Sequence, residues 1–122
     1  RTVPCATQLM PTPDADQSLK LELRRGALVL AVLSQLREAQ YGYSLRQALA
    51  QRGMPIEEGT LYPLLRRLDA QGLLASDWRV GDGPPRRYYQ LNARGAALLA
   101  SLGETWRELV TTMDGLLAAP DA

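Results

Sequence analysis

The chain has 122 residues, of which 46% are hydrophobic and 22% are charged. These values fit one globular domain with at most a short extension. The longest apolar run, residues 27–33, is too short to cross a membrane, which takes roughly 20 apolar residues.

The chain contains no histidine and one cysteine, Cys5. Histidine is the usual general base near neutral pH, so its absence excludes the common hydrolase and zinc-protease arrangements. A lone cysteine excludes an internal disulfide and a multi-cysteine zinc site. Because the sequence also has no phosphate-binding glycine loop, it predicts neither an enzyme nor a bound metal or cofactor.

The net charge of +1 is unevenly distributed along the chain. Residues 20–94 contain 12 Lys and Arg against 7 Asp and Glu, whereas residues 95–122 carry a net charge of −3. A basic segment followed by an acidic one indicates a polyanionic partner for the first and a different task for the second.

The first elements are an arm and a helix. Residues 1–18 contain three prolines and little apolar periodicity, which predicts an extended or flexible arm. Residues 19–37 are rich in Leu and Ala at helical spacing on more than one face. This pattern predicts a helix that is buried on several sides.

A second, short helix is expected to run from Tyr43 or Ser44 to about Arg52. Ser44 and Gln47 have the spacing of a capping box. Gly53 then suits the position just beyond the helix end.

A third helix is predicted from about Glu58 to Gln71, followed by Gly72 as its stop. Pro63 lacks an N–H and must lie in or near the first turn. The apolar stripe has the spacing i, i+3, i+4, i+7 and consists of Leu61, Leu64, Leu65 and Leu68.

The periodicity then changes to that of a β-hairpin. Residues 73–80 and 86–91 alternate in polarity, and residues 81–85, Gly-Asp-Gly-Pro-Pro, form a dense turn signal between them. The alternation places Arg87 and Tyr89 on one face and Arg86 and Tyr88 on the other. We expect Tyr89 to pack in the core.

Asn92 can cap a last helix that runs to about Ala118. The apolar residues of this helix are spaced alternately by three and four, as in a coiled-coil seam. They are Leu99, Leu102, Trp106, Leu109, Met113 and Leu116, and Val110 and Leu117 widen this apolar stripe. A domain of about 75 residues cannot bury such a stripe alone. The sequence therefore predicts a homodimer, with the partner's first helix filling part of the interface.

Three helices and a two-stranded hairpin define a mainly α fold with a small β-hairpin (α+β). This is a winged helix-turn-helix with an added long C-terminal dimerisation helix. The expected division is an arm over residues 1–18, a winged-helix DNA-binding domain over residues 19–91, and a dimerisation helix and tail over residues 92–122.

The polar face of the third helix suits DNA reading. A helix in the major groove needs short polar groups and arginines, because arginine binds guanine edges and hydroxyls bind phosphates. The candidates are Thr60, Tyr62, Pro63, Arg66 and Arg67. Glu57 and Glu58 are unfavourable near phosphate. The alternative is that Arg66 and Arg67 only form a solvated face.

The hairpin favours the DNA interpretation. Its Gly-Pro tip followed by Arg86 and Arg87 suits a thin, rigid wing whose cations lie on phosphate or enter a minor groove. Tyr88 joins these two arginines as a candidate DNA-binding residue.

Trp106 lies in the middle of the predicted seam and permits two interpretations. It packs in the dimer interface, as aromatic residues in seams commonly do. Alternatively, two symmetry-related indoles flank a cavity and stack on a flat apolar ligand.

Four motifs occur in a fixed order: Tyr41-Gly42-Tyr43, EGTLYPLLRRL at residues 58–68, Gly72-Leu73-Leu74, and GPPRRYY at residues 83–89. Together they closely resemble the PadR family of bacterial transcriptional regulators. The resemblance covers about residues 22–117, and the single C-terminal helix is similar to that of the small members of the family.

The resemblance implies a dimeric winged-helix repressor that senses a small molecule and releases operator DNA. In some members a tryptophan of the last helix lines a pore at the dimer interface, and Trp106 matches that position. Residues 1–18 are longer than the usual N-terminus of the family. The DNA-contacting positions that carry over are Tyr43, Ser44, Thr60, Tyr62, Pro63, Arg66, Arg86 and Arg87.

We therefore expect a homodimeric repressor, cytoplasmic and associated with the nucleoid, that binds a near-palindromic operator through the third helix and the wing. Its expected partners are double-stranded DNA, a second copy of itself and a small aromatic or hydrophobic effector, with no membrane. The alternative is a winged-helix protein–protein interaction module without DNA binding.

Overall fold

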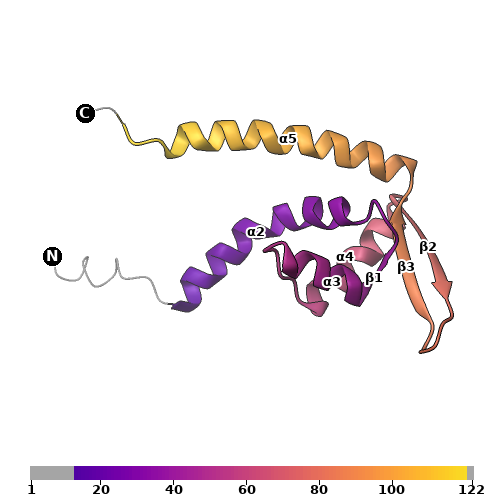
Figure 1. Cartoon of the computed structure of the whole chain (residues 1–122). Coiled ribbons are helices and arrows are strands. Elements are labelled where there is room, and N and C mark those ends of the chain that lie inside the picture. Colours follow the sequence, from indigo (N-terminus) through magenta and orange to yellow (C-terminus); the bar gives the residue numbers. More distant parts are fainter. Residues whose placement is uncertain (1–12, 121–122) are drawn as a thin grey trace.

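The computed structural model describes residues 13–120, and the part of the predicted arm at residues 1–12 lies outside the described residues. The described part contains four helices and one antiparallel sheet of three strands, which confirms the predicted α+β class. In chain order the elements are α2 (Pro13–Gln35), β1 (Gln40–Tyr41), α3 (Gly42–Gln51), α4 (Glu58–Ala70), β2 (Leu74–Arg79), β3 (Arg86–Leu91) and α5 (Ala93–Leu117) (Figure 1).

Helix α2 begins six residues earlier than the sequence pattern indicated, so the prediction of an arm is wrong for residues 13–18. Pro13 occupies the first helical position, where its missing N–H costs nothing and its fixed φ favours the helix. Asp14 and Asp16 in the first turn interact favourably with the positive end of the helix dipole. These local effects extend the helix without any apolar face to bury.

The start of α3 also differs from the expectation. Ser44 is the third residue of the helix, and its Oγ accepts a hydrogen bond from the backbone N–H of Tyr41 at 3.1 Å. The predicted pairing of Ser44 with Gln47 is therefore wrong, and the Gln47 amide donates instead to the Tyr43 hydroxyl at 2.7 Å. Gly53 follows the helix with a φ of +87°, as expected for a glycine that ends a helix.

The sheet has the strand order β1-β3-β2, with both pairs antiparallel. The predicted hairpin is present as β2 and β3, whose register pairs Trp78 with Arg87 and Arg79 with Arg86. Strand β1 was not predicted, because two residues are too short to show a period of two. It adds to the free edge of β3, with Tyr41 opposite Tyr88.

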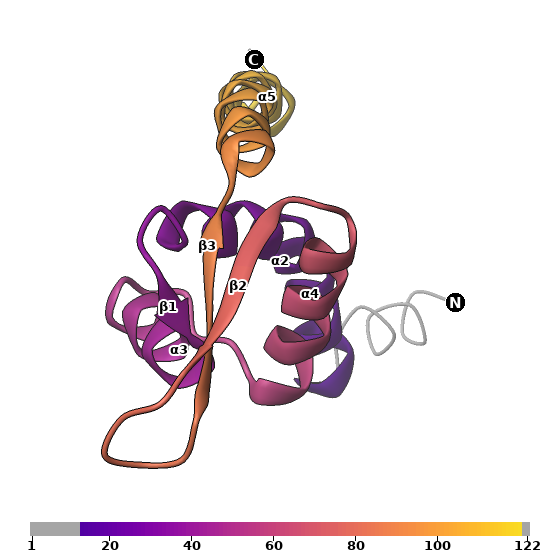
Figure 2. The same cartoon turned by 90° about the vertical axis from the view of Figure 1, so that its right-hand side faces the viewer.

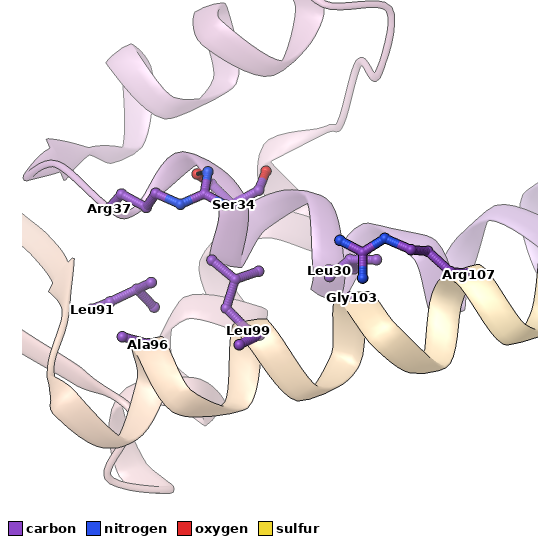
Figure 3. A pocket seen from close by; sticks show the side chains of 9 residues that line it. Leu30, Ser34, Arg37, Leu91, Ala96, Leu99, Gly103 and Arg107 are labelled. Carbon is purple, nitrogen blue, oxygen red and sulfur yellow. Dashed lines mark hydrogen bonds between the residues drawn. The ribbon is translucent and has the colours of Figure 1, made fainter.

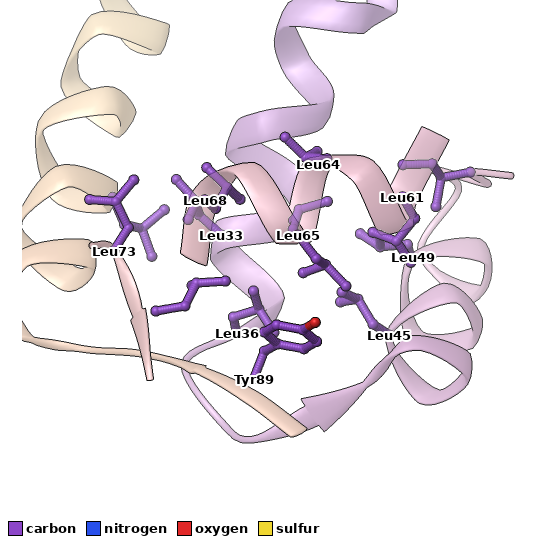
Figure 4. Packing of buried hydrophobic residues seen from close by; sticks show 14 residues of the cluster. Leu33, Leu36, Leu45, Leu49, Leu61, Leu64, Leu65, Leu68, Leu73 and Tyr89 are labelled. Atoms are coloured by element: carbon purple, nitrogen blue, oxygen red, sulfur yellow. The ribbon is translucent and has the colours of Figure 1, made fainter. Parts of the chain in front are cut away.

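The core lies between α2, α3, α4 and the sheet, and Figure 4 shows the leucines of these helices meeting Tyr89. The predicted stripe of α4 is buried along its whole length. Tyr89 is only 7% exposed, which confirms the expectation that it packs in the core. Helices α3 and α4 approach closely at Gly42, where any Cβ would overlap the ring of Tyr62.

Helix α5 is capped as predicted, since the Asn92 side chain accepts a hydrogen bond from the Gly95 N–H at 2.8 Å. Its first turns pack on the domain, and Leu99 is only 7% exposed within the single chain. Leu99, a predicted interface residue, therefore belongs to the core of the chain, because α5 packs on α2 and β3 at this point. Further on, α5 runs along one side of the domain (Figure 1), and Figure 2 shows it nearly end-on, above α2 and the hairpin. None of the helices in residues 13–120 is both long and apolar enough to cross a membrane.

Candidate nucleic-acid interface

One side of the molecule gathers most of the predicted site residues. Helices α3 and α4 flank the hairpin, and the hairpin tip projects past them, away from α5 (Figure 2). We call β2, β3 and the connecting residues 80–85 the wing. The side that carries the wing tip and the start of α4 is the candidate interface.

Helix α4 presents its polar face on this side. Its leucines are buried, whereas the predicted residues Thr60, Pro63, Arg66 and Arg67 are exposed. Tyr62 is half-buried because its ring lies against Gly42 of α3.

The acidic residue at the start of α4 has a local partner. Glu58 pairs with Arg46 of α3 at 3.5 Å, and Arg46 also donates to the Ile56 carbonyl at 3.2 Å. This pairing reduces the repulsion that Glu58 would exert on a phosphate.

A groove of about 350 Å³ separates α4 from the wing, and it brings four predicted site residues together: Tyr62, Arg66, Arg86 and Arg87. Tyr41 and Trp78 also line the groove, and neither was predicted as a site residue. Trp78 is 65% exposed although it is a large aromatic residue. The sequence offered one signal for it: Trp78 lies three residues before the turn signal, on the same face of the hairpin as Arg87.

Two arginines of the wing, Arg79 and Arg86, lie over tyrosine rings. The Arg79 guanidinium lies 4.3 Å from the ring centre of Tyr88, and that of Arg86 lies 4.5 Å from the ring centre of Tyr41. The rings of Tyr41 and Tyr88 meet edge to face at 5.3 Å. Such contacts limit the freedom of the guanidinium groups while leaving their N–H donors available. Arg79 was not predicted as a site residue.

Arg87 differs from its neighbour Arg86. Arg87 lies on the face of the wing that also carries Tyr89, which we call the inner face, whereas Arg79 and Arg86 lie on the other, outer face. The Arg87 guanidinium donates to the Asp69 carboxylate of α4 at 2.8 Å. The predicted wing cation therefore has a partner within the protein. The two-residue alternation from Tyr89 already placed Arg87 on the inner face.

The two candidates at the start of α3 are in different situations. Tyr43 is exposed and stacks beside Tyr41, with ring centres 6.5 Å apart. The Ser44 hydroxyl is engaged locally, since it donates to the Gln40 side chain at 2.7 Å and accepts from the Tyr41 N–H.

The apolar stripe of α5 is exposed after its first turns. Leu102 is half-buried against the core, Trp106 is 46% exposed, and Leu109, Val110, Met113, Leu116 and Leu117 are also exposed. On α2, Leu19, Leu21 and Leu23 are exposed as well. Exposed apolar residues that repeat along one face of a helix, as they do on α5, indicate an interaction site.

A cleft of about 390 Å³ lies between α2 and α5. Figure 3 shows its apolar floor, which includes Leu30, Leu91 and Leu99, and its two arginines, Arg37 and Arg107. Trp106, the candidate ligand-binding residue, is not among the residues that line this cleft.

The fold and the site define a winged-helix protein with an added C-terminal helix. Residues 29–101 match the model of the transcriptional regulator PadR-like family. The chain belongs to this family of transcriptional regulators, and family members are regulators rather than enzymes.

Relatives and solved structures agree with this assignment. A transcriptional regulator of Mycobacterium tuberculosis is 38% identical over 95 residues, which is 77% of this chain and 89% of the relative. The crystal structure of a PadR family transcriptional regulator from Eggerthella lenta is 50% identical, with a TM-score of 0.82 over 88% of this chain and 96% of that chain. A PadR-like regulator from Bacillus cereus is 29% identical, with a TM-score of 0.71 over 81% and 99% of the two chains.

Proposed function

We propose that this protein is a homodimeric repressor that binds a near-palindromic DNA site through α4 and the wing and leaves it when a small ligand binds. The observation that carries the proposal is the convergence of Arg66 on α4 and Arg86 on the wing at one open groove. Two arginines from separate elements that line one exposed groove indicate a binding site for a polyanion rather than a solvated surface without a partner.

Helix α4 has the composition and exposure of a major-groove helix. Thr60 and Arg66 are exposed on its outer face while the leucines hold its inner face in the core. We expect Arg66 to contact a base edge or a phosphate, and Thr60 to bind a phosphate near the helix start. Arg67 belongs to the last turn and extends the cationic surface.

The wing adds a second contact with the duplex. Arg86 and Arg79 face each other across the two strands on the outer face of the wing. Like charges directly opposite on a hairpin repel each other, and a phosphate placed between them would relieve that repulsion. Asp77 offsets part of it through its pairing with Arg79 at 3.5 Å.

The exposed apolar stripe of α5 supports dimerisation. The helix has 25 residues and is therefore about 37 Å long, but only its first turns are buried in the chain. A second copy that covers residues 102–117, together with the exposed leucines of α2, would remove this apolar surface from water. A two-fold axis would then place two copies of α4 on successive half-sites of one DNA face.

A flat apolar effector is the expected ligand, and Trp106 is the residue that would stack on it. Two symmetry-related indoles near the dimer axis would form the walls of that site. Binding there would release DNA by changing the distance between the two copies of α4 in the dimer. A protein with this function works in the bacterial cytoplasm, at the nucleoid.

The test is to select binding sites from a random pool of duplex DNA with the purified protein and to measure affinity against salt concentration. The proposal expects an inverted repeat among the selected sequences and an affinity that falls steeply with salt. Failure to enrich any sequence, with no salt-dependent affinity for DNA, would favour the alternative of a protein–protein interaction module.

A further inference from the structure

Three side chains tie the wing to helix α4. The Arg87 guanidinium lies 2.8 Å from the Asp69 carboxylate, and the same nitrogen is 3.0 Å from the Ser76 hydroxyl. Ser76 in turn donates to Asp69 at 3.3 Å. Among the ion pairs of residues 13–120, this is the one that joins a helix to the hairpin.

The cluster is placed where it controls the orientation of the wing. Asp69 lies in the last turn of α4, while Ser76 and Arg87 lie on the inner face of strands β2 and β3. Beyond them the hairpin continues to its tip at residues 80–85, which are exposed and project past α3 and α4 (Figure 2). Any rotation of the hairpin at this base is therefore amplified at the tip.

Beyond its pairing with β1 at Tyr88 and Tyr89, the wing is a two-stranded hairpin, and such a hairpin alone is only marginally stable. The Asp69 side chain is 25% exposed and that of Arg87 is 39% exposed, so solvent screens this pair less than a fully exposed one. The short distance and the bridging hydroxyl make it a charge-assisted contact.

We propose that Asp69 and Arg87 are a positioning pair that fixes the wing relative to α4, so that Arg86 contacts DNA and Arg87 does not. This inference rests on the proposed DNA binding. It separates two neighbouring arginines of identical chemistry: Arg86 lies over Tyr41 on the outer face, and Arg87 is held by Asp69 on the inner face. A wing that is already oriented loses less conformational freedom when it binds.

The proposal predicts the direction in which Asp69→Asn changes the affinity for DNA. Removal of a carboxylate near DNA, with release of an arginine, would strengthen binding if Arg87 were a phosphate contact. A positioning pair predicts the reverse, because the released wing must be reoriented on binding. We expect Asp69→Asn and Arg87→Gln each to weaken binding about fivefold or more.

The dependence on salt separates positioning from direct contact. Each lost phosphate contact lowers the slope of log affinity against log salt by about 1, which is about 2 for a symmetric dimer. Arg86→Gln should lower the slope by that amount. Arg87→Gln should lower the affinity and leave the slope unchanged. Arg87→Lys keeps the charge but not the forked geometry, and it should fall between Arg87→Gln and the wild type.

The decisive experiment is the exchanged pair, Asp69→Arg with Arg87→Asp, measured on the duplex that the wild-type protein selects from a random pool. We expect the exchange to restore the affinity to within about threefold of wild type, while Arg87→Asp alone does not. Thermal unfolding of every variant monitors the fold. If the wild-type protein binds DNA but Asp69→Asn binds it as tightly or more tightly, the positioning role of Asp69 and Arg87 is contradicted, while the proposed DNA binding is not. If wild type selects no DNA, the proposed function itself fails.

Discussion

Gly95 of α5 lies directly against the carbonyl oxygen of Leu73, which precedes β2, so that any Cβ at this position would collide with backbone. The contact explains a glycine inside a helix, where glycine costs about 1 kcal/mol relative to alanine. It fixes the point at which the long helix leaves the domain, and therefore the direction of its exposed seam.

We expect Gly95→Ala to lower the free energy of unfolding by about 1–3 kcal/mol, although alanine is the better helix former. Neither α5 nor the Leu73 backbone can move without disturbing the Asn92 cap and the start of β2. Urea denaturation at one fixed protein concentration measures the change.

Gly103→Ala is the matched control for this substitution. Gly103 lies in the same helix, but a Cβ there would approach only the Arg107 guanidinium, at 3.8 Å. We expect this variant to be about 0.5–1 kcal/mol more stable than wild type. Equal effects of the two substitutions would contradict the importance of the contact with Leu73.

Most of the fold could be predicted because its elements are determined by patterns of neighbouring residues. The buried leucines of α4, the hairpin, and the Asn92 cap follow from spacing and side-chain chemistry that act over a few residues. Strand β1 could not be predicted, since Gln40 and Tyr41 become a strand only through their pairing with β3.

The candidate site was predictable in composition but not in geometry. The sequence indicates which arginines are off the apolar stripe, but it does not show that Arg87 meets Asp69, 18 positions earlier. It also does not show that Arg79 and Arg86 lie over the rings of Tyr88 and Tyr41, since these contacts depend on how three strands align. Tertiary pairing of this kind leaves no periodic signal in the chain.

Arg66→Ala and Arg86→Ala should each weaken binding to the selected duplex by about 1–3 kcal/mol, because each removes a cation from the groove between α4 and the wing. Fluorescence anisotropy with labelled DNA over a range of salt concentrations is the measurement. Arg94→Ala is the control, since Arg94 is exposed at the start of α5, away from the wing tip. If neither arginine of the groove affects binding and Arg94 does, the interface lies elsewhere on the molecule.

Leu109→Glu should convert the homodimer into monomers at micromolar concentration. It places a charge in the middle of the exposed apolar stripe of α5, where burial of an unpaired carboxylate is costly. Sedimentation velocity reports the mass. Thr111→Glu adds the same charge to the opposite, polar face of the helix and should leave the dimer intact. A wild-type protein that sediments as a monomer at high concentration would exclude the two-fold arrangement on which the DNA model depends.

Trp106→Ala should abolish the binding of planar aromatic dyes if the two indoles form the effector site. The chain has two tryptophans, so the fluorescence is measured in a Trp78→Phe background, in which quenching by the dye reports on Trp106 alone. Stacking of a flat ring on the indole is worth about 0.5–1.5 kcal/mol beyond the area buried, and two indoles per dimer act on one ligand. Trp106→Phe retains a smaller ring and should retain part of the affinity, which separates stacking from a general loss of packing. A dye affinity that Trp106→Ala leaves unchanged, with the dimer intact, would assign this residue to interface packing and direct the search for the effector to the cleft between α2 and α5.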